Sequence, residues 1–181
     1  MFKEKKLIQF LLLSIGLYFL WFGLYEFYLK NEGHLDQVIT ENITIVMTFF
    51  LKLTGFDVHY MNSYKLGETY VFLGQNKYPF LRVGASCNGL ELLVLFTIFI
   101  ICYPGSSKYK IPYIIVGNIC IHILNIFRNY VLAILSIHKS EYFDLFHRYI
   151  FIFMVYGFVF WLWIFWSNKF SKLKKQDEQT N

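Results

Sequence analysis

Charged residues are scarce in this chain of 181 residues, which separates it from most soluble proteins. Lysine, arginine, aspartate and glutamate make up 16% of the sequence, whereas soluble domains carry about 25%. Hydrophobic residues reach 56% and aromatic residues 22%. The net charge of +5 does not indicate nucleic-acid binding, because the positive residues cluster at the chain ends and beside apolar runs. The composition therefore predicts a membrane protein with lipid as its solvent.

Cysteine is scarce as well, which excludes two further classes of protein. The chain has only Cys87, Cys102 and Cys120, too few for a disulfide scaffold and without metal-site spacing. Cys102 and Cys120 lie inside apolar runs, where a thiol usually packs as a small hydrophobic group. Cys87 instead stands directly before the apolar run that begins at Leu90. Neither a metal nor an organic cofactor is predicted.

Four apolar runs predict membrane-spanning helices, since a helix needs about 20 mostly apolar residues to cross the hydrocarbon core. The first is longer than the apolar part of a signal peptide, about 7–15 residues, and is expected to remain as an anchor. Pro112 is expected in the first turn of the third helix, where proline is tolerated. The runs lie at residues 7–29, 89–103, 111–137 and 149–166.

The segment between the first two runs predicts less regular structure. Residues 38–53 favour an amphipathic helix in the membrane interface, because polar residues interrupt the apolar pattern; a fifth span is the alternative. The segments GFDVHY and GETYVFL, with Gly67 nearby, predict a small hairpin. The expected fold is an all-α, polytopic membrane bundle of about four transmembrane helices, with an interfacial helix and a small extracytoplasmic loop region.

The lysines predict the orientation of this bundle, because Lys and Arg near span ends resist translocation. With four spans, the lysines at both ends and between the second and third runs all face the cytoplasm. Residues 1–168 then form one membrane domain with cytoplasmic termini, residues 169–181 form a basic cytoplasmic tail, and Cys87 lies at the outer mouth of the second span. These lysines are Lys3, Lys5, Lys6, Lys108, Lys110, Lys169, Lys172, Lys174 and Lys175.

The third run carries a stripe of polar residues. Asn118, His122, Asn125 and Asn129 recur at offsets of 4, 7 and 11 residues, within about 60° of arc on a helix. Arg128 lies on the flank of this stripe. A membrane-buried arginine costs at least about 2.5 kcal/mol and usually faces a functional protein interior, although snorkelling to headgroups is the alternative. His122 is expected to pack by hydrogen bonding rather than to catalyse.

Three residues from three predicted helices suggest chemistry at the outer end of the bundle. A thiol such as Cys87 needs a base or a positive neighbour to become a thiolate, and the imidazole of His147 can supply that base. The guanidinium of Arg128 can stabilise an oxyanion or bind a substrate carboxylate. The backbone N–H groups of Asn88 and Gly89, at a helix start, can add to such a site. The sequence predicts a membrane-embedded cysteine acyl-transfer site that faces outward.

These three positions also resemble the exosortase/archaeosortase family, which consists of integral membrane cysteine transpeptidases or peptidases of prokaryotes. The matching motifs are ASCNGLELL around Cys87, NIFRN around Arg128 and LFHRYIFIFMVYG around His147, in the family's order. The approach to the cysteine, TFFLKLTGFDV followed by FLRVGASCNG, is also similar. The similarity extends over about residues 40–157.

The resemblance implies a sorting enzyme of the cell membrane. Family substrates are exported proteins that end in a short motif, a transmembrane helix and a basic cluster, and the enzyme cuts them outside the membrane through an acyl-enzyme thioester. This implies that Cys87 is the nucleophile, His147 the general base and then acid, and Arg128 the stabiliser of an oxyanion or substrate. Asn125 and Asn129 are expected to orient Arg128.

Two positions depart from the family's usual motif and leave the subtype and substrate open. An extra Ser86 precedes the cysteine, and Asn88 stands where the family often has serine. The short length and the Lys-, Asn-, Ile- and Phe-rich composition are similar to compact bacterial exosortases, the F subtype among them. Two other functions remain open: a non-catalytic scaffold whose polar stripe binds a partner helix, and a thiol-dependent acyltransferase.

Overall fold

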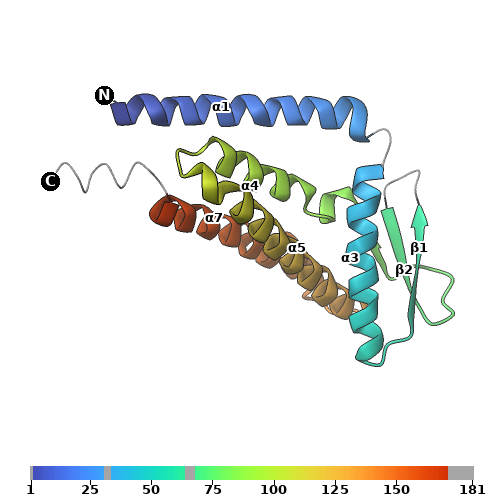
Figure 1. The fold of residues 1–181 in the computed structure, drawn as a ribbon. Coiled ribbons are helices and arrows are strands. Elements are labelled where there is room, and N and C mark those ends of the chain that lie inside the picture. Colours follow the sequence, from blue (N-terminus) through green and yellow to red (C-terminus); the bar gives the residue numbers. More distant parts are fainter. Residues whose placement is uncertain (1, 31–33, 64–67, 171–181) are drawn as a thin grey trace.

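Helices make up most of the chain. The computed structural model describes residues 2–30, 34–63 and 68–170, except the side chains of residues 2–4 and 86 (Figure 1). In chain order the elements are α1 (Phe2–Leu24), the π-helical turn η1 (Tyr25–Leu29), α3 (His34–Leu53), β1 (Val58–Ser63), β2 (Glu68–Leu73), β3 (Leu81–Val83), the 3-10 turn η2 (Ala85–Cys87), α4 (Leu90–Cys102), α5 (Ser107–Ile137), α6 (Phe143–Leu145), the π-helical turn η3 (Phe146–Ile150) and α7 (Phe151–Phe170).

Three helices in the described part of the chain are long and apolar enough to cross a membrane: Lys5–Leu29, Ser107–Ile137 and Phe143–Phe170. The predicted helical membrane fold is therefore confirmed. The predicted count of four spans is not confirmed, because α4 has only 13 residues. At about 1.5 Å of rise per residue it covers about 20 Å, less than a hydrocarbon core of about 30 Å.

Two of the predicted spans lie within longer helices. α5 begins at Ser107 rather than at residue 111, so Pro112 lies in the second turn of the helix and not in its first. The last span begins at Phe143, because α6 and η3 continue without a break into α7. Most of the predicted basic tail, residues 171–181, lies outside the described residues.

The core of the membrane part lies between α4, α5 and α7. Aromatic and branched side chains from all three helices pack into one buried cluster. α1 runs alongside α4, and Phe10 makes edge-to-face contacts with Phe99 and Tyr103 at centroid distances of 5.2 and 5.1 Å. Only 6% of the apolar window of α1 is buried, so the helix touches the bundle along a narrow strip. The members of the cluster are Leu92, Phe96, Ile100, Ile121, Val155, Val159, Leu162 and Trp166.

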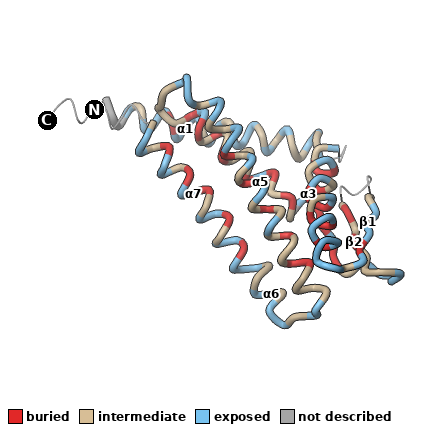
Figure 2. The backbone as a smooth tube through the Cα atoms, turned by 60° about the horizontal axis from the view of Figure 1, so that its bottom comes forward, coloured by how far each residue is buried: buried red, intermediate tan, exposed pale blue. Residues whose placement is uncertain are grey.

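Helix α3 crosses the end of the bundle steeply, and the sheet lies beyond it (Figure 1). The predicted helix over residues 38–53 lies within it, and buried residues follow one of its sides (Figure 2). That side includes threonines whose hydroxyls bond to their own helix: Thr44 Oγ1 donates to Thr40 O at 2.8 Å and Thr48 Oγ1 to Thr44 O at 2.7 Å. α3 is not among the candidate spans, and its place relative to the membrane stays a prediction.

The predicted hairpin is present and belongs to a larger sheet. β1 and β2 pair antiparallel from Val58↔Leu73 to Ser63↔Glu68, whereas Gly67 lies outside the described residues. A third strand, β3, was not predicted; it pairs antiparallel with β2 and gives the order β1-β2-β3. The inner face of the sheet packs against α3 and α5. The chain leaves β3 directly into the turn that contains Cys87.

A close contact between α4 and α5 gives a test of this packing. Gly117 is buried, and a Cβ there would overlap the ring of Phe96. We expect Gly117→Ala to destabilise the purified protein in detergent by about 1–3 kcal/mol, the usual cost of overpacking a core. Gly157→Ala on α7 is the matched control, because a Cβ there meets nothing within 4 Å. Equal thermal unfolding temperatures for the two variants would contradict this packing.

Candidate active site

Cys87 lies in a tight connection between β3 and α4. The turn η2 ends at Cys87, and Gly89 then adopts a φ of 76° to start the helix. Most residues avoid this left-handed region, which glycine enters freely. A Cβ on Gly89 would also lie 2.7 Å from Asn125 Nδ2. Glycine at this position therefore lets the cysteine sit at the start of α4, pressed against α5.

The thiol of Cys87 meets the imidazole of His147. Cys87 Sγ lies 3.7 Å from His147 Nε2, and the imidazole stacks on Phe143 at a centroid distance of 5.8 Å. His147 lies near the start of the last candidate span, as expected, and it belongs to the π-helical turn η3 inside this continuous helix. Such turns recur at functional sites because they displace side chains from the regular helical pattern. The pair has the composition and separation of a thiol nucleophile with its base.

Two asparagines of α5 bind the backbone of Cys87. The carboxamide nitrogens of Asn125 and Asn129 donate to the Cys87 carbonyl at 3.2 and 3.4 Å. Asn129 also donates to the carbonyl of Asn125 at 2.9 Å. Both amides are directed at the peptide group of Cys87, and the expectation that these residues orient Arg128 stays a prediction.

The rest of the polar stripe also faces protein. Asn118 Nδ2 donates to Thr97 Oγ1 of α4 at 3.0 Å, and His122 Nε2 lies 2.8 Å from Asn42 Oδ1 of α3. The packing role expected for His122 is confirmed by this contact. The stripe thus joins α5 to α3, to α4 and to the turn with the thiol.

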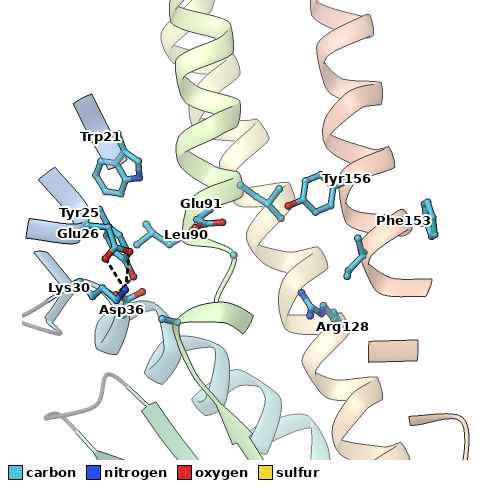
Figure 3. Close-up of a pocket in the computed structure, with 14 residues that line it drawn as sticks. Trp21, Tyr25, Glu26, Lys30, Asp36, Leu90, Glu91, Arg128, Phe153 and Tyr156 are labelled. Atoms are coloured by element: carbon cyan, nitrogen blue, oxygen red, sulfur yellow. Dashed lines mark hydrogen bonds and ion pairs between the residues drawn. The ribbon is translucent and has the colours of Figure 1, made fainter. Parts of the chain in front are cut away.

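Two cavities meet at this turn. Cys87 and His147 line a cavity of about 450 Å³. Arg128 lines a second cavity of about 750 Å³, between η1, the start of α4 and the start of α7 (Figure 3). Ala85 lines both cavities. The three predicted residues therefore converge on one region, but the guanidinium and the thiol open into neighbouring spaces.

The guanidinium of Arg128 is turned inward. Figure 3 shows it projecting from α5 at the side of the larger cavity. Its Nε atom is buried and has no hydrogen-bond partner among the described residues. The positive charge also acts on the nearby imidazole of His147. This position favours a role in the protein interior over snorkelling to headgroups.

A carboxylate stands at the rim of the smaller cavity. Glu68 accepts a hydrogen bond from the Tyr70 hydroxyl at 2.8 Å and forms a 3.7 Å ion pair with Arg82. The hydrogen bond to Glu68 raises the pKa of Tyr70 above its ordinary value. The Glu68 side chain packs over Gly84, where a Cβ would lie 3.3 Å from its Cγ. The acidic group is thus fixed by its neighbours in the cavity that Cys87 also lines.

Sequence reasoning missed Asp36, which is only 3% exposed. Its carboxylate accepts from Asn88 Nδ2 at 2.7 Å and from the Tyr25 hydroxyl at 2.8 Å. Asn88 Oδ1 accepts in turn from the backbone N–H of Leu90 at 2.9 Å. These bonds tie η1 and α3 to the residue after Cys87. The role predicted for the backbone N–H groups of Asn88 and Gly89, as donors to an oxyanion, stays a prediction.

Removal of the Asp36 carboxylate tests this network. Asp36→Ala leaves the Asn88 amide and the Tyr25 hydroxyl without their acceptor, at a cost of about 1–3 kcal/mol for each buried group. We therefore expect a clear loss of stability in thermal unfolding of the detergent-purified protein. Glu41→Ala is the matched control, since Glu41 lies on the same helix and is only partly buried. A loss of the same size in both variants would contradict the special role of Asp36.

Comparison with known families covers nearly the whole chain. The family model Exosortase_EpsH, described as transmembrane exosortase, matches residues 2–168. The match includes the turn with Cys87, the polar stripe of α5 and the helix with His147. Comparisons with curated proteins and with solved structures each gave no match. By the extent of the family match, the chain belongs to the transmembrane exosortase family.

Proposed function

We propose that this protein is a membrane-embedded cysteine transpeptidase or peptidase that cleaves the C-terminal sorting signal of exported proteins. Family membership suggests a membrane transpeptidase. The observation that carries the proposal is the approach of Cys87 Sγ to His147 Nε2, at 3.7 Å beside an open cavity. A non-catalytic scaffold would have no need for a thiol and an imidazole from distant parts of the chain to meet.

In the proposed reaction, His147 takes the proton of the Cys87 thiol as the sulfur attacks the carbonyl carbon of the substrate peptide. The new C–S bond gives a tetrahedral intermediate with a negative oxygen. When this intermediate collapses, the C–N bond breaks and His147 donates its proton to the departing amine. An acceptor nucleophile or water then attacks the thioester, gives its proton to His147 and releases the acyl group, after which Cys87 recovers a proton.

Arg128 and the asparagines have separate tasks in this scheme. The guanidinium of Arg128 binds an oxyanion or a substrate carboxylate. It reaches this group across the turn at Ala85, a residue that lines both cavities. Asn125 and Asn129 hold the peptide group of Cys87, and so keep the sulfur in line with the imidazole.

The proposed orientation places this site on the extracytoplasmic side of the cell membrane, with both termini in the cytoplasm. Two observations support it. The lysines beside the apolar runs cluster on one side in the predicted topology. α1 begins and α7 ends at one end of the bundle, while the sheet lies at the other (Figure 1). The substrate is then an exported protein whose C-terminal motif lies outside the membrane, before its own transmembrane helix and basic cluster.

Substitution of the cysteines tests the nucleophile. We expect Cys87→Ala to abolish C-terminal processing of an exported protein with a motif–helix–basic tail, measured by immunoblot in cells. Cys102→Ala is the matched control, because Cys102 is buried in a hydrophobic cluster with Phe10 and Ile98. Equal processing in the wild type and in Cys87→Ala would remove the enzymatic proposal.

Substitution of the arginine tests the stabilising role. Arg128→Lys keeps the positive charge but loses the planar fork of donors, so we expect processing to slow about 100-fold, the usual loss for one oxyanion donor. Arg148→Lys is the matched control, because Arg148 is exposed and its ion pair with Asp144 is long, at 3.9 Å. Initial rates of processing in membrane vesicles give the comparison, and unchanged rates for Arg128→Lys would contradict the role.

A further inference from the structure

β3 forms an edge of the sheet and leads into the turn with the thiol. It pairs with β2 on one side, and no other described strand pairs with its second side. Much of the wall of the smaller cavity comes from β3 and its flanks, and Phe143 and His147 of the last helix line the same cavity. The cavity is therefore a groove between a strand edge and a helix, which also holds Cys87. The wall residues in question are Phe80, Leu81, Arg82, Gly84 and Ala85.

This strand edge is firmly fixed. The Phe80 carbonyl accepts a hydrogen bond from Ser136 Oγ of α5 at 2.6 Å. Leu81 and Val83 are buried in the core beneath the sheet, at 9% and 0% exposure. A rigid edge offers backbone donors and acceptors to an added strand without a cost for ordering the protein.

The groove is also suited to an apolar side chain. Phe80, Leu81, Leu132 and Phe143 give it apolar walls. The charges of Glu68 and Arg82 at its rim pair with each other. A neutral, extended polypeptide can therefore bind in the groove without leaving either of these charges unpaired.

We propose that the substrate binds as an extended segment that adds to the edge of β3 as a fourth strand. Its scissile carbonyl then lies at Cys87, and one apolar side chain lies between Leu132 and Phe143. This binding mode rests on the proposed function. Strand pairing fixes the register of the bound segment, because a slip of one residue turns every side chain to the opposite face. The register thus selects which peptide bond meets the thiol.

Peptide probes that alkylate the thiol test this mode without the natural substrate. The parent probe is acetyl-Val-Ala-Leu acyloxymethyl ketone, and three further probes each carry one N-methylated amide. The protein is the full chain in detergent with Cys102 and Cys120 changed to alanine, so that Cys87 is its single thiol. Mass spectrometry follows the alkylation rate of Cys87, and iodoacetamide reports its reactivity towards a reagent without a peptide.

We expect an alternating result, because successive N–H groups of a strand point in opposite directions. Methylation of an amide that faces β3 should slow alkylation about tenfold, whereas methylation of its neighbour should have little effect. Equal rates for all probes, or an equal loss at every position, would overturn strand addition. The proposed function is tested separately. It fails if Cys87 of the single-thiol protein reacts with iodoacetamide equally fast with and without the His147→Ala change.

The apolar walls give a second readout. Phe143→Ala should lower, about fivefold, the preference for the parent probe over the same probe with glycine in place of leucine. The ratio of the two rates cancels any change in the reactivity of the thiol that results from the lost stacking on His147. Phe160→Ala is the matched control, because Phe160 is an exposed residue of α7. An unchanged ratio in Phe143→Ala would overturn the apolar subsite.

Discussion

The rest of the site depends on the hydrogen bonds that α5 donates to the peptide group of Cys87. Two carboxamides, from Asn125 and Asn129, reach the same carbonyl oxygen, and Gly89 leaves room for the first of them. Because this turn is fixed, the thiol meets the imidazole of His147, which another helix carries. Buried polar contacts of this kind contribute little net stability but define one arrangement.

Much of the fold could be predicted, because apolar periodicity and length are local signals. The long helices, the amphipathic stretch inside α3 and the hairpin all come from such signals. β3 could not be predicted, since three residues carry no usable pattern and the strand exists through its pairing with β2. The true start of the last helix was missed for a related reason: the polar residues around His147 hide a helix that continues through a wide turn.

Some residues of the candidate site could likewise be predicted from local signals, whereas others could not. Cys87, Arg128 and His147 could be selected because each is costly or unusual at its place in an apolar sequence. Asp36 could not, because its partners Tyr25 and Asn88 lie 11 and 52 residues away, and only the tertiary fold buries it. The cavity that the Arg128 side chain enters could not be predicted from the sequence either. A helical wheel gives the angle of the side chain around the helix axis, but not the space into which it reaches.

The sparse burial of α1 has a consequence for the larger cavity. Because so little of this candidate span packs against protein, its tilt can change with the thickness of the surrounding bilayer. Trp21 and Tyr25 close one side of the cavity, and Tyr25 reaches Asp36 directly. The lipid composition of the host membrane therefore becomes one of the variables that set the shape of the space in front of Arg128.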